Sequence, residues 1–109
     1  MSISALNAGY SGLQAFQRAL DTSGHNVANS LTNGFTPQQV ALQEGTSGGV
    51  AAVVTGGGNN ASASSAEPSG TDLQNELVNS LQYKEGFEFS AKVVKTSDEV
   101  FATLLSLKA

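Results

Sequence analysis

The first candidates for chemistry in this 109-residue chain are one histidine and one nearby carboxylate. Asp21 precedes His25, the only histidine, by four residues, so a helix would set both side chains on one face, where a serine would complete a Ser-His-Asp arrangement. A hydrolase nucleophile also needs a sharp turn from a strand into a helix, and no serine here has that context. We therefore expect no catalytic residue and interpret His25 as a polar residue near a helix end.

The remaining residue types argue against metal, phosphate and cofactor sites. The chain has no cysteine, and one histidine leaves too few ligands for zinc or another transition metal. Residues 55–58 are glycine-rich but lack the lysine of a P-loop. The carboxylates Glu85 and Glu88 are typical of a solvated helix face. We expect no cofactor and no metal ion.

Charge and hydropathy disfavour two further classes of partner. Nine acidic and five basic residues give a net charge of -4, and the basic residues are spread out, so no cluster is available to replace counterions on a nucleic acid. No apolar run approaches the roughly 20 residues that cross a bilayer. An amphipathic membrane-surface protein would need basic residues beside its apolar stripe. We expect neither nucleic-acid binding nor membrane insertion.

Apolar residues three and four apart predict a long helix over residues 3–31, with the heptad spacing of a helix that buries one stripe. Gly34, which accepts a positive φ, and Pro37, which cannot continue a helix, predict its end. The residues of this helix that we expect to pack against a second helix are Leu6, Tyr10, Leu13, Leu20 and Val27.

A second periodic block predicts a helix over residues 72–107, with an N-cap available among residues 69–72 and Lys108 at the negative end of the helix dipole. The expected fold is mainly α, with the two long terminal helices paired as a coiled coil or helical hairpin. The residues of the second helix that we expect in this intrachain contact are Leu77, Phe87, Ala91, Val94 and Phe101.

The middle of the chain has linker composition. Residues 35–70 are rich in glycine and serine, and within them two strand-capable runs at 40–44 and 50–55 predict one small β-hairpin. Such a hairpin is marginal in water and needs packing from elsewhere. We expect residues 56–70 to form a flexible linker. The predicted organisation is an N-terminal helix in 1–34, a hairpin and linker in 35–70, and a C-terminal helix in 71–109.

The C-terminal half of the second helix is apolar over a wider arc than one partner helix covers. Each large aliphatic side chain left in water forgoes about 1.5–3 kcal/mol of burial free energy. We therefore infer that other subunits provide the missing cover. The residues that we expect at these subunit contacts are Val93, Val100, Leu104 and Leu107.

Motifs at both ends of the chain resemble one protein family. The segments ISALNAGYSGLQA (3–15), ALDTSGHNVAN (19–29) and TNGF (32–35) resemble the N-terminal signature of bacterial flagellar axial proteins, which form the rod, the hook and the hook-filament junction. The segments DLQNELVN (72–79) and AKVVKTSDEV (91–100) resemble the C-terminal helix of the same family. The short middle region favours a rod-like member over a hook subunit.

The resemblance implies a non-enzymatic structural subunit that assembles with itself into a tubular helical polymer and with other axial proteins. It also implies location in the flagellar basal body after passage through the flagellar type III export apparatus. Residues 1–6 lack the features of a cleaved secretory signal, in agreement with that route. The alternative is a small binding module or export-related regulator that docks on axial proteins through the same helices.

A cluster of polar and small residues near the end of the first helix forms a candidate helix-end motif. Amide side chains there can bond freed backbone groups, and the resemblance adds a second interpretation, in which they fix the elbow between the helix and the β element. The presence of Gly34 is better explained by the backbone conformation that a glycine allows than by a chemical role. The residues of the motif are Asn26, Ala28, Asn29, Asn33, Gly34 and Phe35.

Overall fold

The computed structural model describes residues 3–45, 48–59 and 68–108 and confirms a mainly helical fold. Two helices dominate it, α1 (Ile3–Ala28) and α2 (Leu73–Lys108). Between them in the chain, β2 (Gln39–Glu44) and β3 (Val50–Thr55) form the expected hairpin, and β1 (Phe35–Thr36) pairs with β4 (Gly58–Asn59). Part of the expected flexible linker, residues 60–67, lies outside the described residues.

Local chemistry explains where the helices begin and end. α1 stops at Ala28, three residues short of the apolar pattern, and the chain turns through Gly34, whose φ of 77° is the positive value expected for this glycine. Asp72 is the N-cap of α2, because its Oδ1 accepts hydrogen bonds from the backbone N–H groups of Gln74 (3.1 Å) and Asn75 (3.3 Å).

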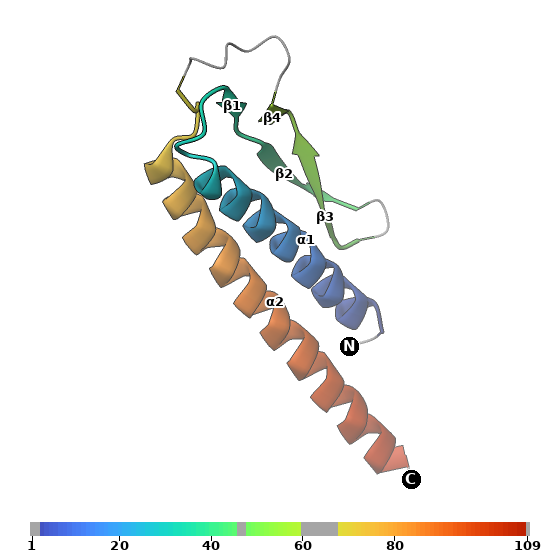
Figure 1. Ribbon diagram of the computed structural model, residues 1–109. Helices are drawn as coiled ribbons and strands as arrows, with labels where there is room; N and C mark the ends of the chain where they lie inside the picture. The colour runs from blue at the N-terminus through green and yellow to red at the C-terminus, as the bar shows by residue number, and fades with distance from the viewer. Residues whose placement is uncertain (1–2, 46–47, 60–67, 109) are drawn as a thin grey trace.

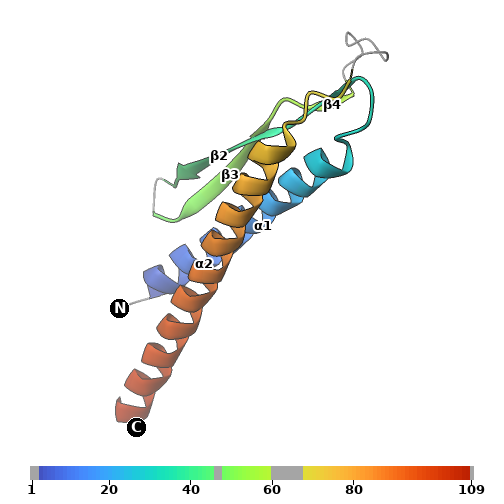
Figure 2. The ribbon, with the colours of Figure 1, turned by 90° about the vertical axis from the view of Figure 1, so that its left-hand side faces the viewer.

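The two helices lie antiparallel and side by side (Figure 1), and a view from the side shows that they cross at an angle (Figure 2). Small residues line their contact. A Cβ placed on Gly9 would lie 2.9 Å from Cγ2 of Val94, and one on Gly12 would lie 2.5 Å from Oγ of Ser90. A Cβ on Gly86 of α2 would meet the Phe16 ring at 2.5 Å. The backbones therefore approach more closely than large apolar side chains would allow.

The β2–β3 hairpin packs on α1, mainly through β3, so that α1 lies between the hairpin and α2 (Figure 1). Its strands are antiparallel, with Val40 opposite Val54 and Glu44 opposite Val50. One hydrogen bond ties it to the helix, from the Val50 backbone N–H to Oγ of Ser11 at 3.0 Å. α1 supplies the packing partner that an isolated hairpin lacks.

Candidate functional site

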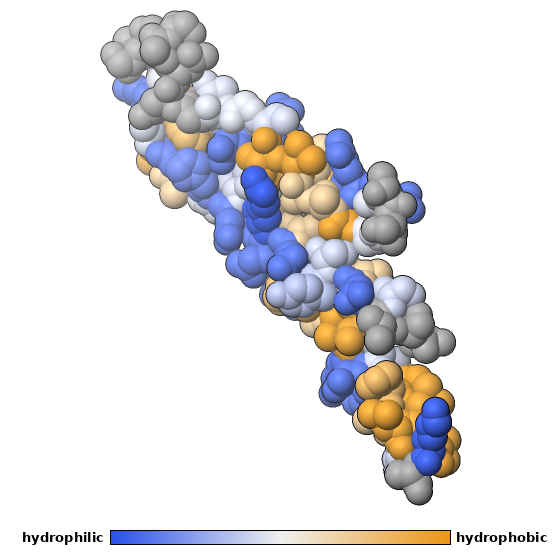
Figure 3. All heavy atoms as spheres, turned by 90° about the vertical axis from the view of Figure 1, so that its right-hand side faces the viewer, coloured by the Kyte–Doolittle hydropathy of each residue, from blue (hydrophilic) through white to orange (hydrophobic). Residues whose placement is uncertain are grey.

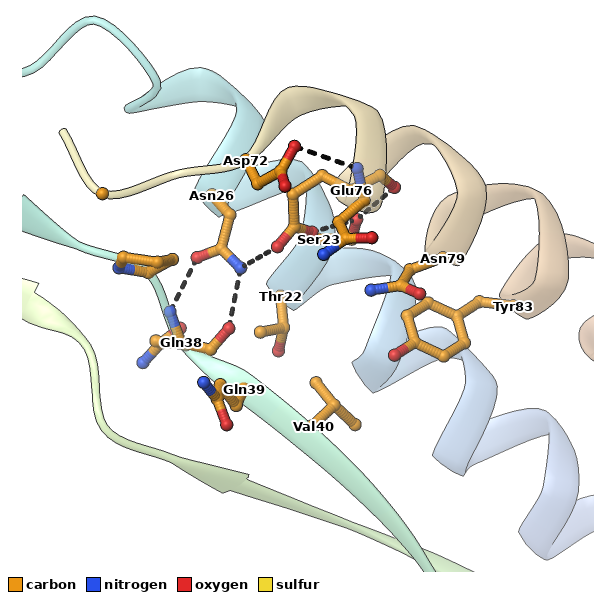
Figure 4. A pocket seen from close by; sticks show the side chains of 13 residues that line it. Thr22, Ser23, Asn26, Gln38, Gln39, Val40, Asp72, Glu76, Asn79 and Tyr83 are labelled. Carbon is orange, nitrogen blue, oxygen red and sulfur yellow. Dashed lines mark hydrogen bonds between the residues drawn. The ribbon is translucent and has the colours of Figure 1, made fainter.

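Asn26, at the end of α1, connects three parts of the chain. Its side-chain Nδ2 donates to the backbone carbonyl of Gln38 (2.8 Å) and to Oε1 of Glu76 (2.9 Å), and its Oδ1 accepts from the Gln38 backbone N–H (2.9 Å) (Figure 4). The Thr71 hydroxyl donates to the Asn26 backbone carbonyl (3.2 Å). The side chain is 1% exposed. One amide thus joins α1, the residue before β2 and the first turn of α2.

Ser23 binds the same glutamate from one turn earlier on α1. Its Oγ lies 2.7 Å from Oε2 of Glu76, to which it donates, and 2.8 Å from Oγ of Ser80, with which it shares a second hydrogen bond. Each carboxylate oxygen of Glu76 therefore has a donor from α1. The carboxylate also lies in the first turn of α2, where the helix dipole favours negative charge. We call Ser23, Asn26, Gln38 and Glu76 the elbow cluster.

A cavity of about 410 Å³ lies beside the elbow cluster, lined by side chains from α1, β2 and α2 (Figure 4). Tyr83 is on its wall, and burial, together with the nearby Glu76 carboxylate, raises the pKa of this phenol above its usual value of 10. Within residues 3–45, 48–59 and 68–108, no three His, Cys, Asp or Glu side chains are grouped to hold a metal ion. The arrangement holds α1, α2 and the segment before β2 together by hydrogen bonds.

The other residues of the helix-end motif act locally or point outward. Nδ2 of Asn29 donates to the His25 backbone carbonyl (2.9 Å), an interaction within the last turn of the helix. The Phe35 side chain is buried and meets the His25 ring edge-on, with ring centroids 5.5 Å apart. Ala28 and Asn33 are exposed. Asn26 is the member of the motif whose side chain hydrogen-bonds to other segments.

The residues expected between the helices fall into two groups. Half-buried members of the set are Leu6, Leu13, Leu20, Val27, Phe87, Ala91 and Val94. Tyr10, Leu77 and Phe101 are instead 57%, 55% and 48% exposed, which corrects the expectation that they are covered within the chain. Tyr10 and Leu77 lie outside the contact because small residues occupy it. Phe101 lies past the end of α1.

That last correction follows from the antiparallel pairing. Gly9 lies opposite Val94, and α1 begins only six residues earlier, at Ile3, so its cover of α2 runs out near residue 100. The end of α2 therefore extends beyond α1, and apolar atoms gather on it (Figure 3). We call residues 101–108 the α2 tail. Its large apolar side chains, between 48% and 79% exposed, are Phe101, Leu104, Leu105 and Leu107.

The residues expected at subunit contacts are also divided. Val93 faces the same chain, because its Cγ1 would lie 3.1 Å from a Cβ on Gly9. Val100 is half-buried, and Leu104 and Leu107 are exposed on the α2 tail. Val93 thus belongs to the contact between α1 and α2 of one chain, whereas the two leucines are free to meet another.

The apolar pattern missed the elbow partners of Asn26 and the close contact between the helices. In the sequence, Glu76 and Ser23 stand out only as members of segments 72–79 and 19–29, which resemble flagellar axial proteins. A signal was nevertheless present, because small or polar residues on α1 also recur three and four apart. These residues are Gly9, Gly12, Ala19, Ser23 and Asn26, and Phe16 is the one large apolar residue in the same row.

Comparisons with known proteins agree with this architecture. The family model described as flagella basal body rod protein matches residues 4–36, and the model described as flagellar basal body rod FlgEFG protein C-terminal matches residues 63–107. The first covers α1 and its elbow, and the second covers α2. The chain belongs to the family of flagellar axial proteins that includes rod and hook proteins, and it is a structural component of the flagellum.

Two of its relatives are hook proteins. The chain is 43% identical over 47 residues to the flagellar hook protein FlgE of Helicobacter pylori strain 26695, and equally to that of strain J99. The aligned part is 43% of this chain and only 6% of the length of either relative. The similarity therefore concerns a short segment of those proteins. No helix within the described residues has both the length and the apolarity to span a bilayer.

Proposed function

We propose that this chain is a rod-like structural subunit that assembles with copies of itself into a tubular helical polymer and joins other axial proteins in the basal body. It acts through its surfaces and not through catalysis. In this proposal it reaches that location through the flagellar type III export apparatus without a cleaved signal.

The observation that carries the proposal is the α2 tail. A chain that completed its fold alone would bury the apolar end of its longest helix, whereas here four large apolar side chains of the tail extend past α1. A second exposed group lies at the other end of α2, at Leu73, Leu77, Val78 and Leu81. Apolar surface at both ends of one helix suits a subunit that has neighbours at both ends.

The shape of the chain agrees with a subunit of a polymer. The molecule extends over 68 × 24 × 15 Å, so most of its side chains lie near its surface. Individual contacts on such a body are weak, but many in parallel give a stiff assembly. The elbow cluster fixes the relative positions of the two helices and the hairpin, so that every copy presents the same surfaces.

Sedimentation of the purified chain over a concentration series, with electron microscopy of the same samples, tests this proposal. The expected result is a rise in mass with concentration and the appearance of filaments or tubes. A chain that stayed monomeric throughout and bound one axial protein in a defined ratio would instead be the small binding module.

The contact between α1 and α2 can be tested by replacing Val94 with Asp. Val94 lies against Gly9, so this change places an unpaired charge in the helix contact and is expected to remove both helicity and polymer. Circular dichroism and microscopy measure the two effects. Survival of both would show that assembly does not depend on the helical hairpin.

A further inference from the structure

We infer that the α2 tail of one copy docks on a leucine stripe at the start of α2 in the next copy, so that copies join head to tail. The inference rests on the proposed self-assembly and specifies its contact. The stripe consists of Leu73, Leu77 and Leu81, which recur every four residues and are 44%, 55% and 64% exposed. The partner is a second copy of this chain.

The hairpin leaves the stripe uncovered. Asn79 and Tyr83 of α2 line the cavity beside β2. Because a helix turns by about 100° per residue, Leu77 and Leu81 lie on the opposite flank of α2. The hairpin itself packs on α1. The stripe therefore lies on the face of the helical pair that carries no β structure, and this chain has nothing further with which to cover it among its described residues.

The lengths of the two surfaces match. The stripe spans eight residue steps, or about 12 Å of helix, and the α2 tail spans seven residue steps, or about 10 Å. Both are therefore about two helical turns, and both present aliphatic side chains. Docking one on the other would bury two uncovered apolar surfaces of α2 together.

Charge favours the same pairing. The tail has one charged side chain, Lys108. Asp72 directly precedes the stripe, and the antiparallel pairing that sets Gly12 against Ser90 places Asp21 level with Leu81. Lys84 follows Leu81 by three residues, so charges of both signs surround the stripe. Two tails placed side by side would instead bring two lysines together with no carboxylate between them.

The contact leads to an open chain of copies. The tail and the stripe are different surfaces, so their contact is heterologous and each added copy leaves one free tail and one free stripe. The centres of the two surfaces are about 27 residues apart on α2, which sets an offset of about 40 Å between copies. Growth continues until another protein caps an end.

Mixing two disabled variants tests this contact directly. L104S/L105S replaces two leucines of the tail and leaves the stripe intact. L77S/L81S replaces two leucines of the stripe and leaves the tail intact. All four side chains are exposed, so we expect native circular dichroism from both variants. Each alone should raise the protein concentration needed for polymer roughly tenfold or more. Together they should form a one-to-one complex that does not grow, because one intact tail meets one intact stripe.

A matched control removes two leucines outside both surfaces. L31S/L42S changes Leu31, which is 93% exposed, and Leu42 on the hairpin, and should polymerise as the parent chain does. If the tail and stripe variants polymerise like this control, the docking contact is wrong while self-assembly stands. Dimers of the stripe variant alone, or no complex in the mixture, would also overturn it. If the parent chain does not polymerise at any concentration, the proposed function fails as well.

Discussion

The two ends of the helical hairpin differ in how their side chains are used. At the elbow, polar side chains are buried and bonded to each other, as Asn26 and Ser23 are to Glu76. At the other end, large apolar side chains of the α2 tail are exposed. Buried polar groups hold one geometry, because a shifted arrangement leaves donors and acceptors unpaired. The apolar end has no such constraint within the chain and remains free for association.

The largest of these effects is expected from a change in the close contact between α1 and α2, which both ends share. Gly86→Leu would drive a side chain into the Phe16 ring and should lower the free energy of unfolding by about 3 kcal/mol. Urea unfolding followed by circular dichroism at low protein concentration measures it. Gly24→Leu is the control, since a Cβ there has no neighbour within 4 Å. Equal responses of the two variants would contradict the close contact.

Removing the elbow amide should have the next largest effect. Asn26→Ala leaves the Gln38 backbone N–H without its acceptor and removes one donor from Glu76, so we expect a loss of about 2 kcal/mol. Asn29→Ala removes two exposed local hydrogen bonds, to the His25 carbonyl and from the Thr32 hydroxyl, and should cost less than about 0.5 kcal/mol. A smaller loss for Asn26 than for Asn29 would show that the elbow does not depend on this residue.

The opposite end should respond differently. Leu105→Ser in the α2 tail is expected to change the unfolding free energy of the monomer by less than about 0.5 kcal/mol, because the side chain is already 55% exposed. The same variant should reduce polymer mass in sedimentation. A stability loss comparable with that of Asn26→Ala would mean that the tail is covered within the chain.

The smallest effect concerns Tyr83 beside the elbow. Its raised pKa means that the folded chain keeps the phenol proton to higher pH than the unfolded chain does. The free energy of unfolding should therefore decrease as pH rises past about 10, more steeply in the parent chain than in Tyr83→Phe. Ultraviolet titration of tyrosinate together with unfolding curves checks it. Identical pH dependence of the two proteins would place Tyr83 in ordinary solvent.

Local signals predicted most of the fold. Strands β2 and β3 begin and end within one residue of the expected runs, because β-branched residues and a glycine-rich turn define a hairpin. The capping chemistry of Asp72 and the positive φ of Gly34 also follow from residue type. The end of α1 was placed three residues too late, since Leu31 continues the apolar spacing into a turn.

The face by which α1 meets α2 was not predictable from apolar spacing. Large apolar residues such as Tyr10 and Leu77 fit a heptad row as well as the true contact residues do. The row of small residues that includes Gly9 and Ser23 allows the backbones to approach, and its partner on α2 includes Ser90, Val94 and Ser97. Hydropathy alone ranks such a row below a row of leucines, whereas close approach and polar bonding decide the contact.

Phe35 brings the borders of residues 60–67 to one place. It pairs in register with Asn59 just before that segment, and its carbonyl accepts a hydrogen bond from the Gly70 backbone N–H just after it (3.1 Å). Because both borders of the segment are held at Phe35, the stability of the helical pair should depend little on the length of the segment. The entropy of closing a loop grows only slowly with its length. A domain inserted at this point would leave α1 and α2 paired as they are here, so the same pair of helices can carry inserted segments of very different size.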